Sequence, residues 1–591
     1  MLGNNDYFVR QMFRKYLLST VLSVIGFTAV GFFNTLLAGR YLGQEALAIM
    51  NFTSSFSFLF SMLGCLINVG AASCAAVAMG QENYKKMGVY VTLAFLLSVL
   101  LSLVVSAMLL ISLKPLFVLM GAEETLYVKS VGYARLLIAT GFLTTLAYFP
   151  FHFLRLDGRG KTSMAVYLIM GMLDVALVFL ALRGGLGLVG LGGAAALAAA
   201  IADITGITLL FLGKNTQIHM EIVTGDQMHE YIPELVKKGS SSALNNLCNM
   251  MRTVLMNSLI VKNLGADEVG VFAVGCAFLN LTSASVGGFG QAVAPVMGVF
   301  YGEKDQDSIR MLMKNAVKGS LLFHAGLFLI MLPLAQPLSR AFGITQTRLL
   351  RESTRLIRWM ALSLVPASVL NVFIYYYMTV DQNFIALTLT FLRAFALVSA
   401  LTALCFSAGY GEGYIIMFLA AEATAILFLV TLCRLRQIMA HGLRGLLLLN
   451  EQNRDANYIS FSVQGSVEGA VLAAEKMRIF CEENHVDFQL TMMLPLTIEE
   501  LLVVMNEHCL GGNESSYADV RILFSEKELL LRIRCGGKIF DPVAWYQRKM
   551  EAMTPKELLE DDSLGIRMVA QKAKSVQFKR TFGMNHLIVV M

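Results

Sequence analysis

The feature that most constrains this chain is a succession of apolar runs, each about as long as a bilayer is thick. A helix needs about 20 apolar residues to cross the hydrocarbon core of a membrane. The 591 residues are 56% hydrophobic and only 15% charged, which excludes an ordinary soluble fold. The runs centre near Ile25, Leu63, Leu100, Ile138, Leu173, Ala200, Leu247, Ser283, Leu327, Leu364, Phe395 and Leu427. The sequence therefore predicts an all-α polytopic membrane bundle of about 12 transmembrane helices.

Charge is distributed unevenly along the chain. Residues 451–591 hold 16 Lys and Arg against 20 Asp and Glu, whereas residues 1–450 hold 31 against 21. The short loops on one side of the predicted bundle carry most of the cations, and only the 336–358 loop opposes this bias. These cations are Lys85, Lys86, Arg155, Arg159, Lys161, Lys214, Lys237, Lys238 and Lys304. Because Lys and Arg accumulate in cytoplasmic loops, we expect a multi-pass protein of the bacterial inner (plasma) membrane with both termini cytoplasmic.

The predicted bundle contains an internal repeat. The segment Arg40–Phe52 aligns with Lys262–Val274, and the same register aligns Ala76–Met87 with Gly298–Ile309, so that Gly80 falls on Gly302. We therefore expect two pseudo-symmetric six-helix lobes, residues 1–222 and 223–445. Repeated halves around a central site are the organisation of several secondary transporters, although an old duplication without a transport role has the same signature.

Three segments carry a family resemblance: "GFFNTLLAGRYLGQEALA", "NVGAASCAAVAMGQENYKK" and "GFGQAVAPVMGVFYGEKDQDSI". Over roughly residues 10–440 the chain resembles multidrug and toxic compound extrusion (MATE) transporters. The resemblance implies an alternating-access cavity between two lobes. It also implies efflux of small amphiphilic or cationic drugs and xenobiotics in exchange for Na⁺ or H⁺. It implies no enzymatic activity and no cofactor beyond the coupling ion.

Acidic side chains inside membrane helices are costly and therefore candidate functional groups. Members of the family usually carry an Asp in the first helix, where this chain has Asn34 in "NTLLAG". In the fifth helix the family often has Asn and then Asp one turn later, and here Asp174 and Val178 take those places. We therefore expect Asp174 to replace the acid missing at Asn34, with Asp203 of the sixth helix as a second candidate. For each acid, a structural hydrogen bond between helices is the alternative.

The second half has its own polar residues within predicted membrane helices. We assign Asn246, Asn249, Arg393 and Glu422 to the substrate cavity or ion pathway of this half. The nine cysteines are scattered and form no C-x-x-C pair, so we expect neither a disulfide framework nor a metal site.

The acidic tail, residues 455–591, alternates predicted strands and helices, which indicates a cytoplasmic α/β sandwich domain with a mixed sheet and helices on one face. A helix is expected to begin at Thr497, because Glu500 follows three residues later in a capping-box pattern.

The order of elements and the motifs of this tail resemble the histidine-kinase-like ATPase fold of anti-sigma-factor kinases. The first motif keeps Glu500 and His508 but has Val504 where the family's Mg²⁺-binding Asn stands. The second keeps Gly537 and Asp541 but has Cys535 in place of the adenine-reading acid, and a thiol is a weak acceptor. The third keeps Gly565 but has Asp562 in place of a glycine. We therefore expect a degenerate domain that does not bind ATP and that docks a cytoplasmic protein partner.

Two other functions remain open at this stage. Relatives in the same superfamily flip lipid-linked sugars, and their cavities carry several Arg and Lys, whereas only Arg252 and Arg393 are expected inside the membrane here. A membrane sensor whose tail captures a protein partner also fits the missing acid of the first helix and the fused domain. The expected partners are thus a small organic substrate, the lipid membrane and a cytoplasmic protein, with no nucleic acid.

Overall fold

The structure is a computed structural model and describes the chain in two compact units. It describes all residues except 1–5, 120–123, 213–215, 217, 265, 342–343, 345, 440–442, 451–456, 511–515, 525–528, 554–565, 568, 570–572 and 582–583. One unit comprises Phe13–Leu435, and the other comprises Met1–Met12 with Arg436–Met591. Each unit is described by itself.

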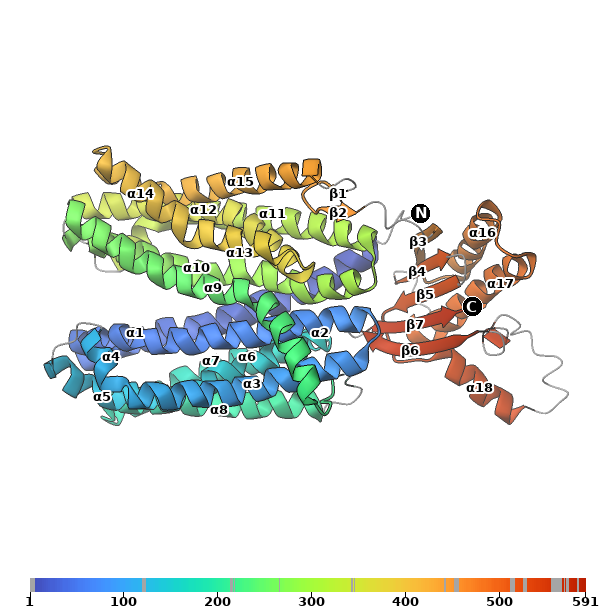
Figure 1. Cartoon of the computed structure of the whole chain (residues 1–591), viewed down its shortest axis with the longest axis horizontal. Helices are drawn as coiled ribbons and strands as arrows, with labels where there is room; N and C mark the ends of the chain where they lie inside the picture. The colour runs from blue at the N-terminus through green and yellow to red at the C-terminus, as the bar shows by residue number, and fades with distance from the viewer. Residues whose placement is uncertain are drawn as a thin grey trace. The chain divides into compact units, whose positions relative to one another are not determined.

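Among its described residues, the regular structure of the unit Phe13–Leu435 is entirely helical. Its first half contains α1 (Asp6–Gly64), the π-helical turn η1 (Cys65–Val69), α2 (Gly70–Gly80), α3 (Tyr84–Ile111), α4 (Leu113–Leu119), α5 (Glu124–Ala139), α6 (Gly141–Leu156), α7 (Gly160–Arg183) and α8 (Gly187–Phe211). Its second half contains α9 (Gly225–Leu264), α10 (Ala266–Gly302), α11 (Gln306–Ala341), α12 (Thr347–Thr379), α13 (Asn383–Phe391), the π-helical turn η2 (Leu392–Ala396), α14 (Leu397–Ser407), the 3₁₀ turn η3 (Gly411–Ile415) and α15 (Met417–Met439). The two halves form two side-by-side groups of helices (Figure 1).

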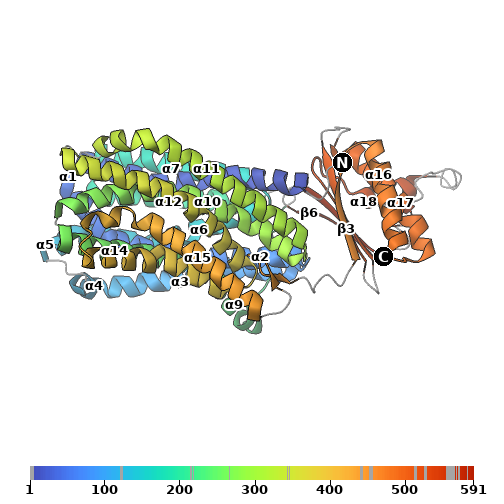
Figure 2. The same cartoon turned by 90° about the horizontal axis from the view of Figure 1, so that it is seen from above.

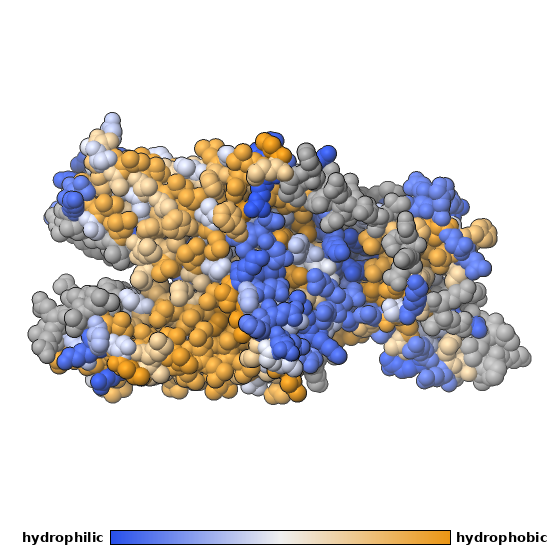
Figure 3. Space-filling view, in the orientation of Figure 1, coloured by the Kyte–Doolittle hydropathy of each residue, from blue (hydrophilic) through white to orange (hydrophobic). Residues whose placement is uncertain are grey.

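Ten helical spans among the described residues are long and apolar enough to cross a membrane. Nine of them contain the centre of a predicted run, and the tenth, Phe488–Cys509, belongs to the other unit. The remaining predicted centres, Ile25, Leu247 and Ser283, lie in α1, α9 and α10. None of the ten spans includes these three residues. Apolar side chains cover most of the visible helical surface, as expected for a lipid-facing bundle (Figure 3).

The turns after α2 and α10 confirm the predicted register of the repeat. Glu82 has φ 62° and Lys304 has φ 56°, so a non-glycine residue adopts the left-handed conformation at the same place in both halves. The next residue caps the following helix in each case. Asn83 accepts a hydrogen bond from the Lys86 N–H, and Asp305 accepts one from the Ser308 N–H.

The repeated glycines bring the two halves together at one end of the bundle. A Cβ atom placed on Gly80 would lie 2.2 Å from the Val299 carbonyl oxygen, and one placed on Gly302 would lie 2.3 Å from the Val77 carbonyl oxygen. Only glycine allows the backbones of α2 and α10 to approach so closely. At the opposite end, where α5 and α14 lie, a hollow separates the two groups of helices (Figure 3).

The C-terminal unit contains a short hairpin and a five-stranded sheet. The hairpin joins β1 (Leu443–Arg444) to β2 (Leu449–Asn450). The sheet has the order β3-β4-β5-β7-β6, formed by β3 (Asn457–Gln464), β4 (Tyr517–Phe524), β5 (Leu529–Cys535), β6 (Ser575–Thr581) and β7 (Met584–Val590). All four neighbouring pairs are antiparallel, so the expectation of a mixed sheet is wrong. Each strand pairs with a neighbour that runs the opposite way, and no parallel crossover joins the described strands.

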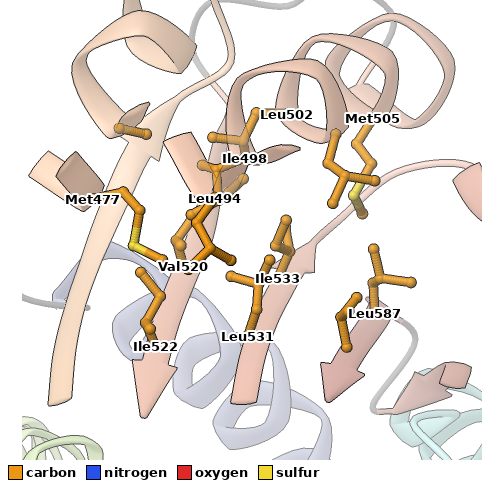
Figure 4. Close-up of a cluster of buried hydrophobic side chains, with 14 of the residues drawn as sticks. Met477, Leu494, Ile498, Leu502, Met505, Val520, Ile522, Leu531, Ile533 and Leu587 are labelled. Atoms are coloured by element: carbon orange, nitrogen blue, oxygen red, sulfur yellow. The ribbon is translucent and has the colours of Figure 1, made fainter. Parts of the chain in front are cut away.

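Helices α16 (Val467–Glu483) and α17 (Phe488–Met505) lie on one face of this sheet, and α18 (Pro542–Ala552) follows β5 (Figure 2). Leu494, Ile498 and Leu502 of α17 point at Val520 and Ile533 of the strands, so the domain's core lies between α17 and the sheet (Figure 4). The apolar span Phe488–Cys509 therefore packs on a sheet here.

The expected helix start at Thr497 is also wrong. Helix α17 begins nine residues earlier, where the Asp487 carboxylate accepts a hydrogen bond from the Gln489 N–H. Pro495 lies inside the helix without ending it, and Thr497 is fully buried in its middle. Burial of the apolar face on the sheet overrides the helix-breaking tendency of Pro495.

Candidate functional site

The structure joins two of the sequence-predicted residues of the first half. Asn34 of α1 donates a hydrogen bond through Nδ2 to Asp174 Oδ2 of α7, at 2.8 Å. Asp174 is 1% exposed and Asn34 is 7% exposed. The Asn34 side chain thus hydrogen-bonds to the Asp174 carboxylate of α7, whereas α1 itself has no acid at this position. The other polar atom of Asn34, Oδ1, has no hydrogen-bond partner among the described residues. This arrangement leaves an acceptor free beside the acid, which suits a proton or a cation.

Asp203 of α8 is also buried but does not bond to this pair. Both of its carboxylate oxygens lack a hydrogen-bond partner among the described residues, although its side chain is 2% exposed. Its electrostatic neighbour is Tyr167 of α7, seven residues or about two helical turns before Asp174. An ionised carboxylate without a hydrogen bond is unstable in an apolar interior, so Asp203 requires a proton or a cation.

In the second half, Arg393 and Glu422 form an ion pair between neighbouring helices. Arg393 Nε lies 3.1 Å from Glu422 Oε1 and 3.2 Å from Oε2, and the two side chains are 13% and 11% exposed. Arg393 lies in η2, where an extra residue widens the helix into one π-helical turn. Such turns occur frequently at functional sites.

Arg252 of α9 lies close to this ion pair. It donates through Nη1 to the Ala394 carbonyl at 3.3 Å, and its guanidinium lies 5.2 Å from the centre of the Phe418 ring. Arg252 is within electrostatic range of both Arg393 and Glu422, and its buried Nε has no hydrogen-bond partner among the described residues. Two guanidinium groups therefore share one carboxylate.

The two predicted asparagines of α9 have different surroundings. Asn246 donates to the sulfur of Cys65 in η1, at 3.5 Å, and so links the two halves of the bundle. Asn249 is half-buried one turn before Arg252, and its carbonyl accepts the hydroxyl of Thr253. Of these two asparagines, Asn249 is the one that precedes Arg252 by three residues and shares its face of the helix.

Sequence reasoning missed Arg155, which was assigned to a cytoplasmic loop. The structure places it in the last turn of α6, 1% exposed, with its guanidinium 3.6 Å from the centre of the Phe151 ring. Its Nη1 lies 3.4 Å from Gln291 Oε1 of the other half. The apolar residues around it in "FHFLRLDG" are the signal that this cation belongs to a helix.

The first motif of the tail lies on α17 and the turn after it, and its described residues contact the rest of the domain. Glu500 accepts a hydrogen bond from the Ile566 N–H at 3.0 Å, and Val504 packs against the apolar core. His508 donates to the Val504 carbonyl, and its ring stacks on Phe540 with centroids 4.3 Å apart. These contacts stabilise the domain without requiring a nucleotide.

The loop after β5 is likewise explained by its backbone. Gly537 has φ +93°, which favours glycine, and Asp541 caps α18 by accepting from the Val543 and Ala544 N–H groups. Cys535 is fully buried next to Cys509, and this contact together with burial raises the pKa of the Cys535 thiol well above its usual value. A thiol that stays protonated does not supply the anionic acceptor of an adenine-reading acid. Asp562 and Gly565 lie outside the described residues.

Comparisons with known proteins fit the helical unit. The MatE family model matches residues 20–180 and 241–404. A curated relative, the "Probable multidrug resistance protein YoeA" of Bacillus subtilis, is 32% identical over 184 residues, which is 30% of this chain and 37% of that protein. The chain thus spans little more than a third of that relative. The "FAD transporter" of Shewanella oneidensis is 22% identical over 331 residues, 55% of this chain and 71% of that protein.

Solved structures show the same fold for the helical unit. One, described as the "outward-facing conformation of a multidrug resistance MATE family transporter of the MOP superfamily", superposes with a TM-score of 0.67 at 18% identity. The superposed region covers 72% of this chain and 95% of the chain in that structure. The family model covers more than half of the sequence, and members of the family are multi-pass membrane transporters, not enzymes. The chain therefore belongs to the MatE family of transporters.

Proposed function

We propose that this protein exports small amphiphilic organic compounds, drugs and xenobiotics among them, in exchange for Na⁺ or H⁺. The observation that carries the proposal is the buried Asn34–Asp174 hydrogen bond, because it places one carboxylate and one free amide acceptor between two membrane helices. An intramembrane acid is a candidate functional site by default, and in a transporter an ion-coupling role fits it.

The coupling ion acts by neutralising Asp174. With Na⁺ or H⁺ bound, the negative charge of Asp174 is compensated, so burying this side chain is no longer costly and α1 and α7 can pack closely around it. Without the ion, the charge favours a hydrated arrangement of the same helices. Asp203 provides a second group that gains or loses a cation in the same half.

The conformation of the bundle suits an exporter. The halves are closed where Gly80 and Gly302 meet Val299 and Val77, next to the turns that Lys86, at the start of α3, follows and that Lys304 occupies. If those cationic turns are cytoplasmic, as their charge favours, the hollow at the other end opens outward.

Gradient-driven flux in proteoliposomes tests the proposal. Purified full-length protein should move a fluorescent amphiphile against its gradient when an inward Na⁺ or H⁺ gradient is imposed, and not when the gradient is collapsed. Absence of flux with both ions would favour the alternative of a membrane sensor.

A second candidate substrate class is larger organic anions. A relative named FAD transporter matches 55% of this chain, and the second half of the bundle carries two intramembrane arginines. A lipid-linked substrate is a third class, because flipping such lipids also uses cationic cavities. Counterflow assays with each class of compound would separate them.

For the tail, we propose a degenerate histidine-kinase-like ATPase domain that docks a cytoplasmic protein. The support is that Glu500, His508, Gly537 and Asp541 are engaged in the domain's own contacts, while Val504 and Cys535 offer no ligand for Mg²⁺ or adenine. Each lost charged contact typically costs about 1–3 kcal/mol, so the three losses at Val504, Cys535 and Asp562 together would weaken a micromolar site to about millimolar affinity or beyond.

The corresponding prediction is that full-length protein shows no Mg²⁺-dependent ATP binding by calorimetry. Micromolar binding would contradict it and would make the protein a nucleotide-gated transporter. The variant Asp541→Ala serves as a structural control, because loss of the α18 cap should cost about 1 kcal/mol of unfolding free energy with no change in nucleotide binding.

A further inference from the structure

The second half of the bundle contains a charge cluster that the coupling mechanism does not use. It consists of Arg252, Arg393 and Glu422, contributed by α9, η2 and α15. With both guanidinium groups charged and Glu422 ionised, the cluster carries a net charge of +1. We infer that this cluster binds an anionic group, a carboxylate or a phosphate, of the transported compound. The inference rests on the proposed function, because it names the substrate class of the exporter.

The ion pair alone does not neutralise the cluster. Arg393 Nε is within 3.2 Å of both oxygens of Glu422, so Arg393 is the direct hydrogen-bonding partner of this carboxylate. Arg252 interacts with Glu422 only electrostatically and from a greater distance, because no hydrogen bond joins the two side chains among the described residues. An excess cation in a membrane interior is unfavourable unless an anion or water compensates it.

The geometry of Arg252 leaves donors for a ligand. Of its nitrogen atoms, Nη1 donates to the Ala394 carbonyl at 3.3 Å, and Nε is buried without a hydrogen-bond partner. Guanidinium groups bind carboxylates and phosphates through paired parallel N–H donors, and Nε with a neighbouring Nη forms such a pair. The Phe418 ring lies 5.2 Å from the guanidinium and adds a cation–π contact.

Polar groups of α9 extend the cluster toward a larger ligand. Asn245, Asn249 and Arg252 follow a four- and a three-residue spacing, so they share one face of the helix, and all three are half-buried. A compound with one anionic group and an uncharged polar body therefore matches this face. A purely cationic compound does not match this face, because the positive charges of Arg252 and Arg393 would repel it.

Binding of a matched pair of dyes to purified full-length protein tests the inference. Fluorescein carries a carboxylate, whereas rhodamine 123 has the same tricyclic xanthene core with amino groups in place of the oxygen substituents, an esterified carboxyl group and a positive charge. We expect fluorescence polarisation to show Arg252→Gln binding fluorescein at least about tenfold more weakly, with rhodamine 123 changed less than about twofold. Arg252→Lys keeps the charge but loses the paired donors, so its fluorescein affinity should fall between those of the wild type and Arg252→Gln. Arg358→Gln, which removes an exposed cation of the same half, should leave both dyes unchanged.

Several outcomes would overturn the inference. These are no fluorescein binding by the wild type, an unchanged affinity in Arg252→Gln, or an equal loss for both dyes. If Arg252→Gln fails to fold, competition on the wild type decides, because benzoate should displace fluorescein and benzylamine should not. Fluorescein binding without gradient-driven flux of either dye would refute the exporter and leave the anion site standing.

Discussion

The two halves of the bundle place their buried polar groups in corresponding helices but give them opposite charge. With the offset that aligns Arg40 with Lys262, Arg393 lies one turn from the counterpart of Asp174, and Glu422 one turn from that of Asp203. Arg252 likewise lies one turn from the counterpart of Asn34. The first half thus has two acids and an amide, and the second has two arginines and one acid.

This difference teaches that duplication preserved the backbone while the chemistry of the two sites diverged. The turns at Glu82 and Lys304 and the glycine contacts at 80 and 302 are equivalent. In the proposed transport cycle, the halves remain equivalent where they meet because closing this end of the bundle uses both glycine contacts. The interior of each half is free to recognise a different ion.

The largest effect is expected from Asp174→Asn. This isosteric change removes the carboxylate but keeps a partner for Asn34, so the fold should survive while gradient-driven efflux falls to the background of empty vesicles. Flux in proteoliposomes and equilibrium binding of the same dye should be measured together. Coupled flux at the wild-type rate would show that the first half is not the ion site.

A large loss of stability is expected from Arg393→Ala. It leaves Glu422 buried without its hydrogen-bonded partner, which typically costs about 3–5 kcal/mol. Thermal unfolding in detergent would measure it. The double variant Arg393→Ala with Glu422→Ala should recover part of the loss, and a double variant no more stable than the single one would argue against a paired charge.

An intermediate and symmetric effect is expected from Gly80→Ala and Gly302→Ala. Each added methyl group meets a backbone carbonyl at 2.2–2.3 Å, and overpacking of this kind costs about 1–3 kcal/mol of the closed form. Both variants should slow efflux by similar factors. Gly326→Ala is the matched control, since no atom lies within 4 Å of its added Cβ. Sharply unequal effects at 80 and 302 would break the equivalence of the two halves.

The smallest effect is expected from Arg355→Ala. This residue pairs with Glu412 at 2.7 Å, but the side chains are 52% and 62% exposed. Water screens such a pair, so unfolding free energy should fall by less than about 1 kcal/mol. Thermal unfolding alongside Arg393→Ala provides the contrast between an exposed and a buried pair of the same half.

Much of the fold followed from local patterns. Apolar runs located nine of the ten described spans, and the repeat at Gly80 and Gly302 predicted which turns would match. Patterns failed where packing overrides local preference. Pro495 and Thr497 lie inside α17, because burial on the sheet outweighs their tendency to begin or break a helix.

Sequence by itself determined the polytopic helical class, the repeated halves and the charged residues within the membrane. These follow from hydrophobicity and spacing, which act over a few residues. Only the tertiary structure decided which of those residues meet: that Asn34 bonds to Asp174, that Asp203 does not join them, and that Arg252 shares Glu422 with Arg393. It also moved Arg155 from a loop into the interior of the bundle. Contacts between helices more than a hundred residues apart depend on how side chains pack in three dimensions, and no local pattern encodes them.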